Sequence, residues 1–169
     1  MSDSRDTRDT RDTRDTRFAA IEKALGYSFD GEIKIGGNYT STVQHGDVVY
    51  VSGQVPRVGS TVVVTGRAGA DVSLTQAQLG AKVCAMRALA LLRQNLGSLD
   101  RIQQVMRVTV YTQSATDFTQ QSEVADAASE VLHTVLGAAG IHTRTSVGVA
   151  QLPKNATVEV DLIAAVTPA

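Results

Sequence analysis

A single arginine begins an otherwise uncharged run near the C-terminal end of this sequence. Arg144 stands at the head of the small and β-branched residues in HTRTSVGVAQLP, and Ser146 and Gly148 follow it at alternate positions. Because alternate residues of a strand share a face, the two small residues would leave space beside the guanidinium. The pattern therefore indicates room for a ligand beside Arg144.

A carboxylate becomes available in the next strand-like segment, ATVEVDLIAAV. Glu159 and Asp161 share one face of this segment, and aliphatic residues occupy the other face. In the preceding segment we expect the side with Val147 and Val149 to be the packed side, so that Arg144 faces away from it. The residues are equally compatible with a ligand pocket and with a salt bridge between Arg144 and Glu159 at a subunit contact, since arginine often forms interface ion pairs.

Several common kinds of site have no signature in the sequence. It contains no glycine-rich phosphate loop of the P-loop or Rossmann type and no G-x-S-x-G nucleophile motif. His45, His133 and His142 do not have metal-ligand spacing, and the lone Cys84 lies among apolar residues, where we expect it to be buried. We therefore expect neither a metal nor a cofactor.

The composition restricts the partners. The 169 residues include 16 basic and 17 acidic ones, which gives a formal net charge of -1. This balance provides no general attraction for nucleic acid or for an anionic membrane. No apolar run approaches the ~20 residues of a membrane span, and the N-terminus lacks the apolar region of a secretory signal. We expect a cytoplasmic protein that binds neither nucleic acid nor membrane.

The N-terminus is a period-three repeat, SDSRDTRDTRDTRDTRF, without an apolar residue before Phe18. We expect residues 1–17 to form a low-complexity tail or a frayed helical extension outside the core. Residues 18–169 would then form a single domain. Residues 17–25, RFAAIEKAL, have helical spacing of apolar residues and are followed by Gly26, which predicts a short N-terminal helix.

The remaining elements follow from periodicity and turn residues. GDVVYVSGQVP and STVVVTG read as two strands of an antiparallel hairpin, and IQQVMRVTVYTQ reads as a further strand. Ser73 and Gln76 form a capping box that begins a long helix, which Gly97 ends. QSEVADAASEVLHTVLG has a buried stripe typical of a second helix, and two strands complete the chain.

This order of elements predicts an α+β domain, a mixed sheet with two main helices packed on one face. The other face of the sheet then lacks a cover within the chain. A sheet of this kind commonly packs against another subunit, which makes a homo-oligomer the expected state.

Two segments resemble the RidA (YjgF) family of reactive-intermediate deaminases. They are YVSGQVP, preceded by the Gly37-Asn38-Tyr39 element, and RTSVGVAQLPKNATVEVDLIA near the C-terminus. The resemblance covers residues 39–166. It implies a chorismate-mutase-like fold and a homotrimer whose ligand pockets lie between subunits, in agreement with the uncovered sheet face.

The resemblance also implies an activity and a set of site residues. The family hydrolyses imines and enamines such as 2-aminoacrylate to a 2-oxo acid and ammonia, without a cofactor. Its carboxylate-binding arginine matches Arg144 and its glutamate matches Glu159, which would accept or relay the proton of the attacking water. Tyr39 would close the pocket from the neighbouring subunit, and backbone groups near Ser52, Gly53 and Ser146 would hydrogen-bond the substrate.

The sequence departs from the family pattern at four positions. Ser146 replaces a common cysteine, Asn38 a proline, Gly148 an acidic residue and Ser122 an asparagine. We therefore expect a divergent branch whose substrate differs from 2-aminoacrylate. A trimer that binds small carboxylates without catalysis, as a regulatory protein, is the alternative. Endoribonuclease activity, also attached to the family, is not supported, because the sequence shows neither an RNA-binding surface nor a paired general acid and base.

Overall fold

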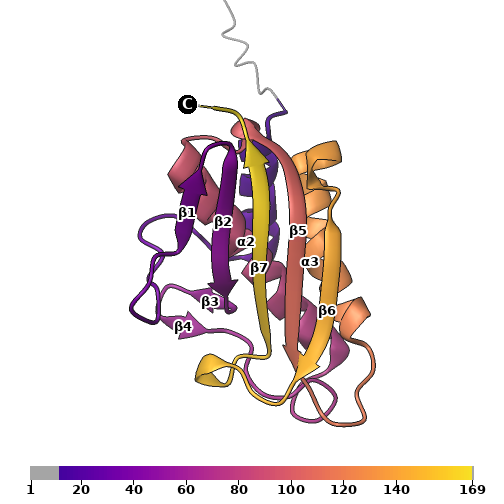
Figure 1. Cartoon of the computed structure of the whole chain (residues 1–169). Helices are drawn as coiled ribbons and strands as arrows, with labels where there is room; N and C mark the ends of the chain where they lie inside the picture. Colours follow the sequence, from indigo (N-terminus) through magenta and orange to yellow (C-terminus); the bar gives the residue numbers. More distant parts are fainter. Residues whose placement is uncertain (1–11, 169) are drawn as a thin grey trace, which may run out of the picture.

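The computed structural model describes residues 12–168. The main sheet has five strands in the order β1-β2-β7-β5-β6, and only β5 and β6 run parallel. Figure 1 shows this sheet from its open face. The strands are β1 (Thr42–His45), β2 (Val48–Gln54), β5 (Ile102–Gln113), β6 (Thr143–Val149) and β7 (Val158–Val166). The predicted α+β architecture is confirmed.

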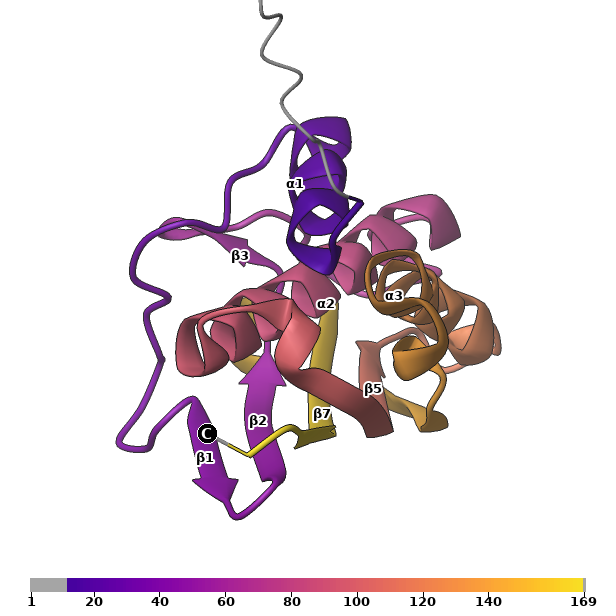
Figure 2. The ribbon, with the colours of Figure 1, turned by 90° about the horizontal axis from the view of Figure 1, so that it is seen from above.

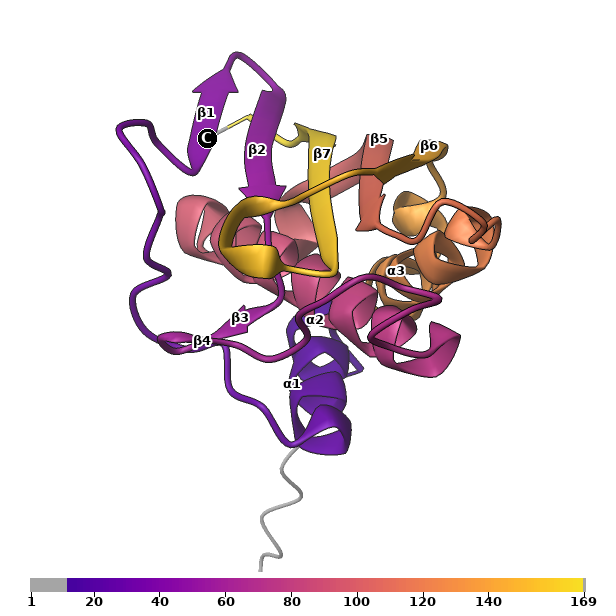
Figure 3. The same ribbon diagram turned by 90° about the horizontal axis from the view of Figure 1, so that it is seen from below.

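Two long helices, α2 (Leu74–Leu96) and α3 (Gln121–Leu136), cover one face of the sheet, as the views along the strands show (Figures 2 and 3). The capping box predicted for α2 is present: Ser73 N donates to Gln76 Oε1 at 2.8 Å and Gln76 N donates to Ser73 Oγ at 3.2 Å. Gly97 ends the helix in the left-handed conformation. The other face of the sheet has no layer of described residues over it.

The core between the sheet and the helices is built from aliphatic side chains of α2, α3, β5 and β7, and Cys84 is fully buried within it, as predicted. Strand β7 alternates strictly between buried and partly exposed residues. Val158, Val160 and Leu162 face the helices, so Glu159 and Asp161 face the open side.

The predicted hairpin between residues 46–56 and 60–66 is wrong. β2 pairs with β1 and β7, and the second segment forms only the small ribbon of β3 (Arg57–Val58) and β4 (Thr61–Val62). Val64 is buried, and Thr65 bridges to Ala156 next to the start of β7. The β-branched run therefore packs across the end of the sheet instead of extending it.

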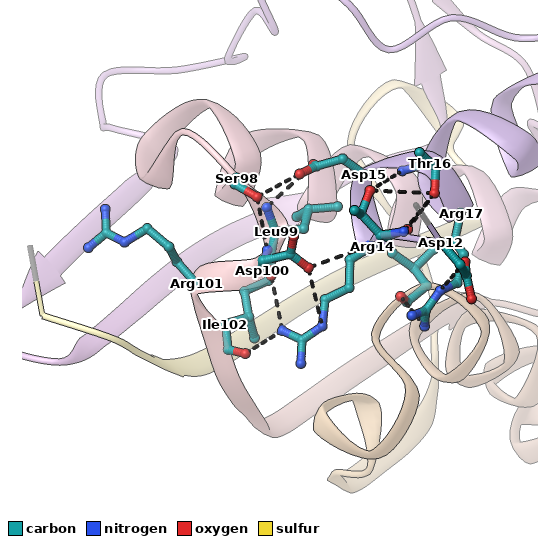
Figure 4. A network of polar contacts seen from close by, with 12 residues as sticks. Asp12, Arg14, Asp15, Thr16, Arg17, Ser98, Leu99, Asp100, Arg101 and Ile102 are labelled. Atoms are coloured by element: carbon teal, nitrogen blue, oxygen red, sulfur yellow. Dashed lines mark hydrogen bonds and ion pairs between the residues drawn. The ribbon is translucent and has the colours of Figure 1, made fainter. Parts of the chain in front are cut away.

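The last repeat units belong to the folded domain. α1 (Arg14–Leu25) begins three residues earlier than predicted, with Thr13 as its N-cap, and it lies on the outer side of α2 and α3 (Figure 2). Arg14 Nη1 donates to the carbonyl oxygens of Leu99 and Ile102, and Asp15 accepts from Ser98 Oγ at 2.6 Å (Figure 4). Residues 14–17 are thus helical, in agreement with the alternative of a helical extension, while residues 1–11 lie outside the described part.

The short 3-10 turns complete the chain. They are η1 (Leu99–Arg101), η2 (Gly137–Gly140) and η3 (Pro153–Asn155). Within residues 12–168, no helix has the length and apolar character that crossing a membrane requires.

Candidate active site

Arg144 lies on the edge strand β6 and extends over helix α3. Its Nη1 donates to Asp126 Oδ1 and to Ser129 Oγ, each at 2.9 Å, and its Nη2 donates to Ser122 Oγ at 3.0 Å. The Arg144 side chain is 19% exposed and the Asp126 side chain is 67% exposed. Positions 122, 126 and 129 recur at helical spacing on one face of α3, so the helix presents three oxygen acceptors in line. Arg144 is thus held in place by its own subunit.

His142 supports the same arrangement from the neighbouring position. One ring nitrogen lies 2.9 Å from Ser129 Oγ and the other lies 2.6 Å from the carbonyl oxygen of Gly140. Burial lowers the pKa of His142, with smaller contributions from His133 and Arg144 that act in the same direction. Ser129 therefore joins His142 to Arg144, and His142 acts here as a structural contact.

Glu159 lies in a different place, at the start of β7 and next to Gly53 near the end of β2. It lines a cavity of about 190 Å³ together with Tyr39 and Gly53. A Cβ atom at position 53 would lie 2.0 Å from Glu159 Oε1. Only glycine therefore lets the carboxylate approach the β2 backbone. We call this space the Glu159 cavity.

The electrostatic environment raises the pKa of Glu159. Burial is the main cause and the neighbouring carboxylate of Asp161 adds to it. The pKa of Asp161 is raised as well, by burial, although hydrogen bonds from Thr109 and Tyr111 lower it in part. Two carboxylates on one strand face, both partly withdrawn from water, hold protons more readily than free acids.

The two serines predicted to touch substrate are not among the residues that line the Glu159 cavity. Ser52 is engaged by Gln54, whose Nε2 donates to the Ser52 carbonyl oxygen at 3.0 Å and to its Oγ at 3.2 Å. Ser146 lines an open depression on the other side of the molecule with Ser114, Gln121 and Gly148. Within one chain the structure therefore brings Tyr39, Gly53 and Glu159 together around the cavity, whereas Arg144 and Ser146 do not line it. Ser52 precedes Gly53 in β2 but does not line the cavity either.

Arg144 and Glu159 occupy opposite faces of the sheet. Arg144 pairs with Val108 of β5, which pairs in turn with Leu162 of β7, and this row faces the helices. Glu159 pairs with Tyr111 of β5, which pairs in turn with Val147 of β6, and this row lies on the open face. The expectation that the valine side of β6 is the packed side is wrong, because Val147 is 39% exposed. β6 is an edge strand, and α3 covers the face with the arginine and the serines. A salt bridge between Arg144 and Glu159 is not formed within the chain.

Sequence reasoning missed four basic residues that line the Glu159 cavity: Lys34, Arg57, Arg87 and Lys154. Arg87 had a recognisable signal, since it is a lone charge within the apolar run CAMRALALL. It also missed the acceptors of Arg144 on α3, although the spacing of Ser122, Asp126 and Ser129 is visible in the sequence.

Among residues 12–168, no group of three or more His, Cys, Asp or Glu side chains is arranged to hold a metal ion.

Comparison with known proteins defines the class. Residues 30–166 match the family model described as Endoribonuclease L-PSP. Protein TCP17 of Trypanosoma cruzi is 41% identical over 127 residues, which are 75% of this chain and 79% of that protein. The chain therefore belongs to the Endoribonuclease L-PSP family, also known as the YjgF or RidA family.

Solved structures agree with this membership. Atu1372 from Agrobacterium tumefaciens, a protein of unknown function, is 35% identical with a TM-score of 0.82, covering 91% of this chain and 95% of that one. Two structures from E. coli share the fold at 24% identity and a TM-score of 0.57. They are the YjgF gene product, which covers 82% of this chain and 95% of its own, and TdcF with bound serine, which covers 79% and 91%. The resemblance found in the sequence is thus confirmed for family and fold.

Proposed function

We propose that the protein hydrolyses reactive 2-imino acids, and the enamines that tautomerise to them, to 2-oxo acids and ammonia. The observation that carries the proposal is the Glu159 cavity, in which a carboxylate with a raised pKa lies beside Gly53 and Tyr39 in a space suited to a small molecule. The membership of the RidA family supports this reaction class.

The opposite orientations of Arg144 and Glu159 indicate how the site is assembled. We infer a homotrimer in which Arg144 of one subunit completes the Glu159 cavity of the next. The open sheet face supports such a contact, because Val43, Tyr50 and Val147 extend from it with 52%, 52% and 39% of their surface exposed. An aliphatic and aromatic surface of this kind commonly packs against another chain.

The chemistry requires orientation more than activation. An imine carbon is attacked by water readily, so the enzyme holds the substrate carboxylate at Arg144 and places one water against the carbon. Glu159 accepts a proton from that water as the carbon–oxygen bond forms. That proton passes to the imine nitrogen, which gives a carbinolamine. Glu159 then relays the proton of the new hydroxyl group to the amino nitrogen, so that the carbonyl forms, the carbon–nitrogen bond breaks and ammonia leaves. A pKa raised toward neutrality makes Glu159 a better proton acceptor than an ordinary carboxylate.

The test is the rate of 2-oxo acid release when the protein is added to an amino-acid oxidase or threonine dehydratase reaction. We expect the wild-type protein to accelerate release and Arg144→Ala to remove the acceleration. Absence of acceleration by the wild-type protein with every small 2-imino acid would refute the proposed activity.

A trimer that binds small carboxylates without catalysis is the second candidate. The observation in its favour is the ion pair of Arg144 with Asp126, which holds the guanidinium in place but offsets its charge. The TdcF structure with bound serine shows that a protein of this fold can hold a small carboxylate. Saturable binding of a 2-oxo acid in titration calorimetry, without turnover of any imine, would favour this reading.

A further inference from the structure

A buried arginine lines the Glu159 cavity without a counter-charge. Arg87 lies in the middle of α2 and is only 6% exposed. Its Nε donates to Gln54 Oε1 at 3.3 Å and its Nη1 donates to the carbonyl oxygen of Arg57 at 2.8 Å. Both acceptors are neutral. Within residues 12–168, no carboxylate forms an ion pair with Arg87 and its Nη2 has no hydrogen-bond partner.

The second arginine of the cavity has an unsatisfied donor. Arg57 Nε is buried, and it has no hydrogen-bond partner within the described part of the chain. A buried donor without a partner costs roughly 1–3 kcal/mol, and more when the group is charged. Repulsion between the two guanidinium groups increases this cost. Burial lowers the pKa of Arg87, and the positive charge of Arg57 lowers it further. An anion bound in the cavity would offset this cost, because Arg57 and Arg87 both line it.

Two lysines extend the same positive charge. Lys34 lines the cavity from the segment before β1, and Lys154 lines it from η3. The η3 loop is fixed by Gln113, whose Oε1 accepts from Leu152 N and whose Nε2 donates to Asn155 Oδ1, both at 2.8 Å. Lys154 itself has a positive φ of 60°. The loop thus keeps Lys154 beside the cavity.

The acidic groups near these cations do not neutralise them. Glu159 is the carboxylate that lines the cavity, against four basic residues. On their other side, Arg57 and Arg87 border a smaller cavity of about 40 Å³ that Asp30 and Glu32 also line. Asp30 is paired with Arg93 at 2.9 Å, and no ion pair joins Glu32 to either arginine. The excess of positive charge is therefore available to a ligand.

We propose that Arg57, Arg87, Lys34 and Lys154 form a subsite for a second anionic group of the substrate, so that the protein prefers 2-imino acids with an acidic side chain. This inference rests on the proposed function, because it assigns the α-carboxylate to Arg144 and the side-chain carboxylate to the four cations. The residues are defined by the cavity they share. We call them the cationic subsite.

The size of the cavity agrees with this class of ligand. A volume of about 190 Å³ lies below the range of about 300–1,000 Å³ that is usual for drug-sized ligands. A four- or five-carbon acid is a suitable occupant. Guanidinium groups recognise carboxylates and phosphates by the same geometry, so the test must separate these two sources of negative charge.

The experiment measures binding of stable 2-oxo acids by titration calorimetry. 2-Oxoglutarate and 2-oxovalerate have the same carbon chain and differ only in the distal carboxylate. Since hydrogen bonds to charged groups contribute about 1.5–3 kcal/mol, we expect the wild-type protein to bind 2-oxoglutarate at least about tenfold more tightly. Arg87→Gln and Arg57→Gln should each remove most of this preference, while Lys82→Gln, at a surface ion pair with Glu130, should leave it unchanged.

Two further variants keep the result interpretable. Lys34→Gln and Lys154→Gln change exposed side chains, so they test the subsite even where a buried arginine variant fails to fold. Equal affinity of the wild-type protein for the two acids, or a preference that survives all four substitutions, would overturn the proposal. Inorganic phosphate that displaces 2-oxoglutarate at lower concentration would overturn the assignment to a dicarboxylic substrate.

The readout separates this proposal from the proposed function. Binding requires no turnover, so a preference for 2-oxoglutarate without deaminase activity supports the subsite and contradicts catalysis. Conversely, equal rates with the imines of alanine and glutamate would contradict the subsite and leave the deaminase intact. Arg144→Ala should weaken both oxo acids by a similar factor, because both present the same α-carboxylate.

Discussion

Arg144 and Glu159 extend from opposite faces of one sheet. Arg144 donates to three residues of α3, and Glu159 lines a cavity at the start of β7 with Tyr39 and Gly53. Arg144 does not line this cavity, and β5 lies between its strand and β7, so the two residues are not placed to contact one small substrate in the same subunit. If both act on the substrate, they must come from different subunits.

Under the proposed function, we expect the ion pair of Arg144 with Asp126 to weaken the binding of a substrate carboxylate. Asp126→Asn removes a negative charge that competes with the substrate, while Ser122 and Ser129 keep the guanidinium oriented. Because Asp126 is mostly exposed, we expect a roughly two- to fivefold decrease in KM with kcat nearly unchanged. Steady-state kinetics at low salt provide the measurement. An increase in KM would show that Asp126 is needed to position Arg144.

The raised pKa of Glu159 predicts a pH dependence. Activity should rise with pH as Glu159 loses its proton, and this acidic limb should lie above the ordinary value of 4.5. Asp161→Asn removes a neighbouring negative charge, which lowers the pKa of Glu159 and should move the limb to lower pH. The amide can still accept from Thr109 or Tyr111. A limb that stays in place in the pH profile of kcat/KM would contradict the role of Glu159.

The same shifts predict a change in stability. The pKa values of Glu159 and Asp161 are raised in the folded state, so above the ordinary values of 4.5 and 3.8 the folded chain binds more protons than the unfolded chain. The free energy of unfolding therefore falls as the pH increases through and above these values. Asp161→Asn should therefore increase the free energy of unfolding at pH 7 and have little effect below pH 3.8. Urea unfolding at the two pH values measures this difference. Destabilisation at pH 7 would mean that the charge of Asp161 is favourable.

Gly53 leaves room for the carboxylate of Glu159. Gly53→Ala would place a Cβ atom 2.0 Å from Glu159 Oε1, so the carboxylate must move. A displacement of about 1 Å at a reacting group can cost about 100-fold in rate, and we expect a loss of kcat of that order. Gly36→Ala is the matched control, because Gly36 lines the same cavity but has no atom within 4 Å of an added Cβ. Similar losses in both variants would contradict the proposed contact.

Much of the fold follows from local signals in the sequence. The capping box at Ser73 and Gln76 and the terminal Gly97 define α2, and the alternation in residues 158–166 gives the burial pattern of β7. These features depend on neighbouring residues only. The sequence also placed Arg144, Ser146 and Gly148 on one strand face, which the register with β5 confirms.

Other features depend on contacts between distant segments. The face of β6 that packs inward was predicted wrongly, because small and β-branched residues occur on both faces and only the position of α3 decides between them. Arg87 reads as one charge in an apolar helix, and its importance appears only when the loops with Arg57, Lys34 and Lys154 surround it. Arg14 and Asp15 belong to a repeat, yet the η1 turn with its N-cap and the start of β5 supply their partners. Tertiary partners of this kind have no local signature.

Co-expression of two inactive variants tests the central claim most directly, since Arg144 and Glu159 should act in one site from different subunits. Arg144→Ala and Glu159→Gln carry separate affinity tags, and mixed oligomers are purified through both. In every trimer that contains both variants, one of the three inter-subunit sites combines an intact Arg144 with an intact Glu159, so about a third of wild-type deaminase activity should return. Arg144→Ala mixed with the double variant is the control and should remain inactive. Mixed oligomers of the two single variants that are equally inactive would contradict the shared site.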